Sequence, residues 1–142
     1  MWACHHRPNS YKDGRGPLSR ALSAYRAFIN ERPTVIAGDF NNNVIWDRPA
    51  KVNNHGTNVS ELAALGLQSA YHCAKAIEQG CEREPTLYWR NRKSDGPRYH
   101  IDYCFVPESW TKAISAVTIC PFEDWVGAKL SDHVPLVVDV NP

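Results

Sequence analysis

The chain has 142 residues, of which 43% are hydrophobic and 22% are charged, and its formal net charge at pH 7 is +1. This length and composition predict one globular domain over residues 1–142, and they exclude a disordered chain or a second domain with its own core. The sequence contains no apolar run long enough to span a membrane and no signal peptide pattern, so we expect a cytoplasmic protein. The five cysteines are odd in number and include no CxxC pair, which favours free and mostly buried thiols over a disulfide framework.

A helix and a strand in direct succession are the first predicted elements. The apolar positions between Leu18 and Arg32 follow the spacing of one helix face, and Pro33 comes directly after them. Residues 34–38 form a short run rich in apolar and β-branched side chains, which predicts a strand buried on both faces. This strand ends at Asp39.

An asparagine-rich loop leads into a second, shorter helix. Residues 42–56 contain four asparagines, a proline and a glycine without any apolar period, which is typical of a loop. Asn58 with Glu61 three residues later resembles a helix N-cap, and Gly66 is typical of a helix C-terminus. We therefore expect a helix between Asn58 and Gly66.

The second half of the sequence predicts strands. Residues 86–89 and 99–106 are expected to form a hairpin, joined by a basic loop that turns at residues 94–97. Alternation within the second of these strands places its odd positions on an aromatic and aliphatic face, with Asp102 on the opposite face. Further strands are predicted over residues 114–119 and 136–140, and residues 1–4 are too few to decide. This mixture of elements predicts an α+β architecture.

Acidic and histidine side chains occur in three segments with a strand context. Asp39 and Asn41 follow the first strand, Asp102 lies inside an apolar strand, and Asp132 with His133 precedes the last strand. The first and last of these segments are also ordinary turn sequences. A carboxylate among apolar neighbours is costly unless it is paired, so Asp102 requires a histidine or a cation as a partner. An aspartate beside a histidine can bind a hard cation while the imidazole transfers a proton or contacts a phosphate oxygen.

Taken together and in this order, the three segments resemble the C-terminal motifs of the endonuclease/exonuclease/phosphatase superfamily, which includes pancreatic deoxyribonuclease, the abasic-site endonucleases and several phosphatases. The matching strings are GDFN at residues 38–41, HIDY at 100–103 and SDHVPL at 131–136. Residues 2–8 also resemble the family strand that ends in a phosphate-contacting histidine, with His5 as the better match and His6 as the alternative. The resemblance implies the C-terminal half of a four-layer α/β/β/α sandwich with a mixed, mainly antiparallel sheet.

The resemblance also implies a phosphoester hydrolase that depends on Mg²⁺ or Mn²⁺. Asp39 would orient or deprotonate the attacking water or protonate the leaving group, and Asn41 would donate a hydrogen bond to a phosphate oxygen. His133 would contact the scissile phosphate, with Asp102 orienting its ring, and His5 would stabilise phosphate charge from the other side of the cleft. The metal ligands implied by the resemblance are Asp39, Asn41 and Asp132.

The first half of the family domain, which carries an asparagine and a metal-binding glutamate, has no counterpart in this sequence. We therefore expect a truncated domain that binds metal weakly and has little or no turnover. Its uncovered apolar surface would call for a complementing N-terminal half or self-association. The substrate stays open between DNA, RNA, a phosphoinositide and a small phosphoester, because the predicted loops carry no pattern that separates them.

Two other interpretations stay open. The chain could be a non-catalytic binder of phosphate or nucleic acid that uses the basic loop with Arg90, Arg92 and Arg98 and binds in a salt-dependent way. Alternatively it could be a zinc module, although the spacing of its candidate ligands matches no zinc pattern. Those candidate ligands are Cys4, His5, His6, Cys73 and Cys81.

Overall fold

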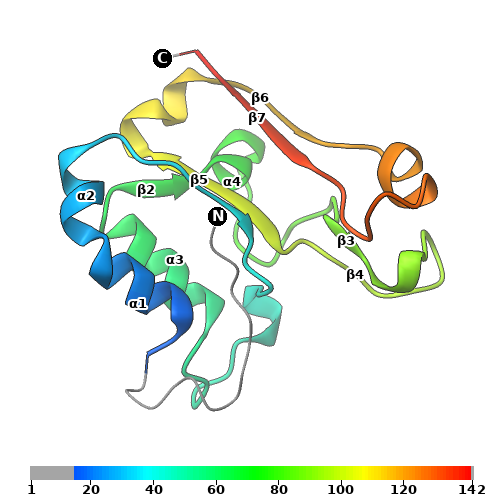
Figure 1. The fold of residues 1–142 in the computed structure, drawn as a ribbon, viewed down its shortest axis with the longest axis horizontal. Coiled ribbons are helices and arrows are strands. Elements are labelled where there is room, and N and C mark those ends of the chain that lie inside the picture. The colour runs from blue at the N-terminus through cyan, green and yellow to red at the C-terminus, as the bar shows by residue number, and fades with distance from the viewer. Residues whose placement is uncertain (1–14, 142) are drawn as a thin grey trace.

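A computed structural model describes residues 15–141 of the chain (Figure 1). It shows helices combined with antiparallel strand pairs, so the predicted α+β class is confirmed. The predictions for residues 1–4 and for His5 lie outside the described residues. Within residues 15–141, no helix is long and apolar enough to cross a membrane.

Strand β5 (Asp102–Pro107) is the centre of the fold. It pairs in antiparallel fashion with β1 (Ile36–Asp39) on one side and with β2 (Leu67–Ser69) on the other. Its side chains alternate between two cores, with Tyr103 and Phe105 in one and Cys104 and Val106 in the other. The alternation predicted from the sequence is therefore confirmed for this strand, and it makes β5 the wall between the two cores.

Helices cover one face of this sheet, and a two-stranded ribbon covers part of the other (Figure 1). On the helical side, α1 (Pro17–Ala24), α2 (Arg26–Glu31) and α3 (His55–Ala63) bury leucine and isoleucine side chains against β5. On the opposite side, α4 (Ala70–Lys75) and the ribbon of β6 (Ile114–Ile119) and β7 (Leu136–Val140) pack against it. Both ribbon strands lie where the sequence predicts them.

A second small ribbon comes directly before β5 in the chain. It consists of β3 (Leu87–Tyr88) and β4 (Arg98–Tyr99). Short helical turns complete the structure: η2 (Val44–Trp46), η3 (Trp89–Asn91), η4 (Glu108–Ala113) and η5 (Glu123–Gly127). Neither β2 nor α4 was predicted, because each is short and its apolar residues follow no clear period.

The first helix and the first strand differ from their predictions. The helix is interrupted at Tyr25, whose φ of −99° and ψ of 8° leave the helical range. Leu18 and Ile29 on the predicted apolar face are buried, but Tyr25 and Phe28 are 64% and 51% exposed. Strand β1 is not buried on both faces either, since only Ile36 packs on the helical core and its other three residues are exposed.

The second helix begins earlier than predicted because its cap comes from a distant residue. Helix α3 starts at His55, so the predicted cap Asn58 lies inside it, with its side chain buried. The carboxylate of Asp47 accepts hydrogen bonds from the backbone N–H groups of His55 at 2.7 Å and Gly56 at 2.8 Å. Asp47 thereby satisfies two donors at the helix N-terminus that have no partner within the helix.

The predicted hairpin and the predicted burial of cysteines also need correction. The strand expected over residues 99–106 is two strands, and its two parts pair with different neighbours: β4 with β3, and β5 with β1 and β2. The four described cysteines are free thiols, as expected. However, Cys73 and Cys81 are exposed, so the expectation that the thiols are mostly buried is wrong for these two.

Candidate active site

The pairing of β1 with β5 places two aspartates directly opposite each other. Asp39 ends β1, Asp102 begins β5, and the two are register partners. Directly opposite residues of an antiparallel pair have Cβ atoms about 5 Å apart on the same face of the sheet. Two carboxylates at this separation repel each other, so the arrangement favours a cation or a proton donor beside them.

His133 provides that donor from a distant part of the chain. Its Nδ1 lies 2.8 Å from Oδ2 of Asp102. A carboxylate oxygen accepts hydrogen bonds, so Nδ1 carries the hydrogen and Nε2 is the ring nitrogen left for another partner. The side chains of His133 and Asp102 are 27% and 18% exposed, which leaves the pair accessible from solvent.

The pKa of His133 is raised above its ordinary value. The hydrogen bond to Asp102 is the largest cause, and burial of the ring opposes it. The negative charges of Asp102, Asp39 and Asp132 each raise the pKa further. The protonated imidazole is therefore stabilised at this position, where it compensates the repulsion between the carboxylates.

Asp39 and Asn41 form a tight turn at the end of β1. Oδ1 of Asp39 accepts the backbone N–H of Asn41 at 2.6 Å, and Asn41 has a φ of 48°. Asparagine adopts this left-handed conformation more readily than most residues. The turn chemistry noted in the sequence is thus real, and it lies at Asp39, whose charge acts on His133.

Asp132 is close to the pair but faces a neighbouring hollow. Its backbone oxygen accepts the N–H of Tyr88 at 2.9 Å, and its side chain is exposed. The hollow beside it has a volume of about 440 Å³, and its lining includes Asp132, Trp89, Arg90 and Lys129. Asp132 acts on His133 through its charge.

A cleft of about 510 Å³ opens at the Asp102–His133 pair. Its walls come from the exposed face of β1, from β5 and from the segment leading into β7. Ser131 lines both this cleft and the neighbouring hollow, so the two adjoin at this residue. Most of the remaining lining is apolar: Ala37, Cys104, Trp125, Pro135, Leu136 and Val138.

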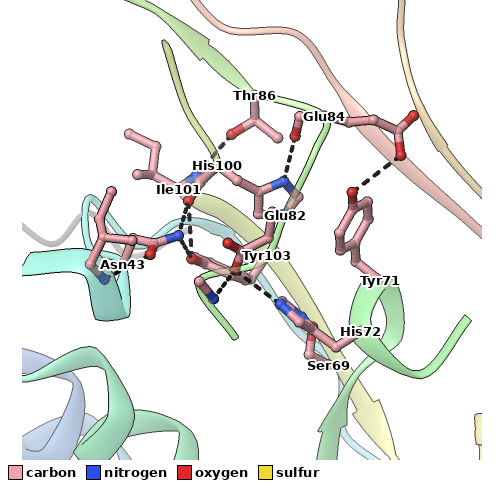
Figure 2. A network of polar contacts seen from close by, with 12 residues as sticks. Asn43, Ser69, Tyr71, His72, Glu82, Glu84, Thr86, His100, Ile101 and Tyr103 are labelled. Atoms are coloured by element: carbon pink, nitrogen blue, oxygen red, sulfur yellow. Dashed lines mark hydrogen bonds and ion pairs between the residues drawn. The ribbon is translucent and has the colours of Figure 1, made fainter. Parts of the chain in front are cut away.

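A buried polar network behind the site was not predicted from the sequence (Figure 2). The side chain of Asn43 donates to the carbonyl oxygen of His100 at 2.9 Å and to the hydroxyl of Tyr103 at 3.0 Å. Asn43 therefore ties the segment after Asp39 to the residues that precede and follow Asp102. The asparagine-rich sequence of residues 42–56 is the available signal, but its composition predicts only a loop.

The same network contains a second pair of a histidine and a carboxylate. Nε2 of His72 lies 3.0 Å from Oε1 of Glu82, and its Nδ1 lies 2.7 Å from the hydroxyl of Ser69. Burial raises the pKa of Glu82, but the hydrogen bonds to His72 and to the N–H of Gly80 outweigh it and bring the pKa to about 2. Both ring nitrogens of His72 are therefore occupied within the protein interior.

The described residues do not by themselves complete a metal site. Among residues 15–141, no three or more histidine, cysteine, aspartate or glutamate side chains come close enough together to hold a metal ion. Cys73 and Cys81, the described members of the zinc candidate, belong to no such group. The predicted ligand role of Asp39, Asn41 and Asp132 stays a prediction.

Comparison with known proteins assigns the family. No curated protein matches the chain. Its fold is similar to the endonuclease domain of TRAS1, a telomere-specific non-LTR retrotransposon, with a TM-score of 0.59 and 19% identity. The match covers 96% of this chain and 55% of that one, so the chain spans about half the length of that domain. The model of the Endonuclease/Exonuclease/phosphatase family matches residues 2–133, and the chain belongs to this family.

Proposed function

We propose that the chain carries the phosphate-binding and proton-donating part of a phosphoester hydrolase site, with His133 as its central catalytic residue. The observation that supports this most directly is the hydrogen bond of 2.8 Å between Nδ1 of His133 and Asp102 at an open cleft. Membership of the endonuclease/exonuclease/phosphatase family supports the same class of reaction.

In this proposal Asp102 orients the imidazole and stabilises its positive charge. Nε2 of the protonated ring then donates to a non-bridging oxygen of the scissile phosphate. Charge on these oxygens grows as the phosphate is attacked, so a fixed cationic donor stabilises the transition state more than the ground state. The raised pKa of His133 is consistent with a ring that stays protonated for this task.

Asp39 and Asn41 act from the end of β1 in the same proposal. The carboxylate of Asp39 orients the attacking water or exchanges a proton with it, and the side-chain amide of Asn41 donates to a phosphate oxygen. The position of Asp39 as the register partner of Asp102, together with the effect of its charge on the pKa of His133, supports this division of roles. His5 would act from the opposite side.

Members of this family generally depend on a divalent metal. We propose Mg²⁺ or Mn²⁺ for this chain, with Asp39, Asn41 and Asp132 as ligands. Because the described residues form no complete metal site, further ligands are needed, and the steps above are assigned to the side chains alone. A segment that packs on the exposed face of β1, from another chain or a second copy, would be a source of such ligands.

Hydrolysis of bis(p-nitrophenyl) phosphate, p-nitrophenyl phosphate and DNA, each with Mg²⁺ or Mn²⁺, tests the proposal. We expect His133→Ala to lower the rate by about 10² to 10⁴ fold, which is the usual contribution of a positioned proton donor. Asp139→Asn is a suitable control, because Asp139 is an exposed residue of β7 outside the cleft. Equal rates for the wild-type protein and His133→Ala would overturn the proposal.

A second candidate function is phosphate or nucleic-acid binding without hydrolysis. It is favoured by the hollow beside the cleft, whose lining includes Arg90, Lys129 and a half-exposed Trp89. Basic side chains neutralise phosphates, and an exposed aromatic ring can stack on a base. DNA binding that weakens steeply with salt, without any product formed, would favour this candidate over hydrolysis.

A further inference from the structure

Thr86 is a buried residue that joins three segments of the site. Its side chain is fully buried, and its hydroxyl oxygen accepts the backbone N–H groups of Ile101 at 3.0 Å and Asp102 at 3.1 Å. Its own N–H donates to the carbonyl of Tyr99 at 2.9 Å, and its carbonyl accepts the N–H of Val134 at 2.8 Å. Figure 2 shows the hydroxyl of Thr86 directed at the backbone of Ile101.

The hydroxyl acts where the backbone changes strand partners. Residues 98–99 pair with β3, whereas residues from Asp102 onward pair with β1 and β2. The N–H groups of Ile101 and Asp102 fall at this break. A hydroxyl oxygen has two lone pairs, so one threonine can accept both N–H groups and hold the start of β5 in place.

The residues after Thr86 hold the backbone around His133. Leu87 forms an antiparallel bridge with His133, and the N–H of Tyr88 donates to the carbonyl of Asp132 at 2.9 Å. Residues 86–88 thus bind the backbone of Asp102 through a side chain and the backbone around His133 through the main chain. The separation of the two catalytic side chains depends on this short segment.

We propose that Thr86 is a positioning residue for the Asp102–His133 pair. The importance of Thr86 to catalysis rests on the proposed function. Its hydrogen bonds are observed in the structure whatever the function is. Valine has nearly the same shape as threonine but no acceptor. In Thr86→Val the two N–H groups lose their partner, so the start of β5 shifts and the hydrogen bond between Asp102 and His133 lengthens.

The first test is spectroscopic and does not need turnover. The Nδ1–H proton of His133 should give a downfield NMR signal in the wild-type protein. Thr86→Ser keeps the hydroxyl and should keep this signal, whereas Thr86→Val should shift it upfield or broaden it. Should Thr86→Val fail to fold, Thr86→Cys, which has a similar size and a weaker acceptor, takes its place in the same comparison.

Leu62→Val separates positioning from a general loss of stability. Leu62 is fully buried on the helical side of the sheet, away from the cleft, so its truncation destabilises the fold without touching the site. The signal of His133 should be unchanged in this variant. An unchanged signal in Thr86→Val, or an equal change in Leu62→Val, would overturn the positioning role.

Turnover provides the second test. We expect Thr86→Val to lower kcat on the order of tenfold to a hundredfold with little change in KM, and Thr86→Ser to restore most of it, because small misplacements of catalytic groups act on the chemical step. If kcat is unchanged in Thr86→Val while His133→Ala is inactive, Thr86 has no positioning role. If the wild-type protein hydrolyses nothing, the proposed hydrolysis fails for this chain on its own, as a truncated domain would, and the NMR comparison still decides the role of Thr86.

Discussion

The molecule contains two pairs of a histidine and a carboxylate with similar N···O distances and different surroundings. His133 and Asp102 are 2.8 Å apart at an open cleft, with side chains 27% and 18% exposed. His72 and Glu82 are 3.0 Å apart, with side chains only 9% and 3% exposed. In the first pair the ring binds Asp102 through Nδ1 and lines the cleft, whereas in the second both ring nitrogens have partners inside the protein. The comparison shows that accessibility, and not the pairing itself, separates a candidate catalytic pair from a structural one.

Loss of the Asp102 carboxylate, the more accessible of the two, should have the largest effect. The effect should be on activity. Asp102→Asn keeps the size of the side chain but removes the charge that stabilises a protonated His133. We expect hydrolysis to fall on the order of 10² to 10⁴ fold, with a small change in the free energy of unfolding. Steady-state kinetics and urea denaturation of the same preparation measure both quantities. A large loss of stability with full activity would reverse the roles assigned to the two pairs.

Loss of the buried Glu82 carboxylate should lower stability and leave activity nearly unchanged. Glu82→Gln leaves His72 without its charged partner in the protein interior, and breaking a buried pair costs about 3 to 5 kcal/mol. Thermal and urea unfolding measure this loss. The rate of hydrolysis per folded molecule should change little, since Glu82 does not line the cleft. Equal stability of Glu82→Gln and the wild-type protein would contradict the structural role.

The acid stability of the fold should depend on His55, the smallest of these effects. Burial lowers the pKa of His55 from 6.5 to about 4, so the unfolded chain binds a proton more readily than the folded one. The free energy of unfolding is therefore highest above about pH 6.5, where His55 is neutral in both states. It falls as the pH drops toward 4, by on the order of 2 to 3 kcal/mol. Urea unfolding at several pH values should show this fall in the wild-type protein and a smaller one in His55→Gln. Parallel curves for the two proteins would contradict it.

Several parts of the fold and of the site were predictable because they depend on short stretches of sequence. The alternation along residues 102–106 and the strands over 114–119 and 136–140 follow from local patterns of apolar residues. The motif residues Asp39, Asp102 and His133 were also singled out from sequence strings, and the structure brings them together.

Other parts could not be predicted because they depend on residues far apart in the chain. The start of α3 is determined by Asp47, eight residues before it. The division of residues 99–106 into two strands follows from their different pairing partners. The exposure of β1 likewise depends on what covers its outer face, which its apolar composition does not reveal.

By itself, the sequence determined the family, the residue types of the site and the strands that carry them, since each is encoded in a few consecutive residues. The pairing of Asp102 with His133, which the resemblance implied, is confirmed by the structure. Only the tertiary structure decided that Glu82 and His72 form a similar pair in the interior and that the Thr86 hydroxyl holds the start of β5. These contacts join segments between 10 and 31 residues apart. Hydrogen bonds and burial at such separations arise from packing of the whole chain, and no local pattern encodes them.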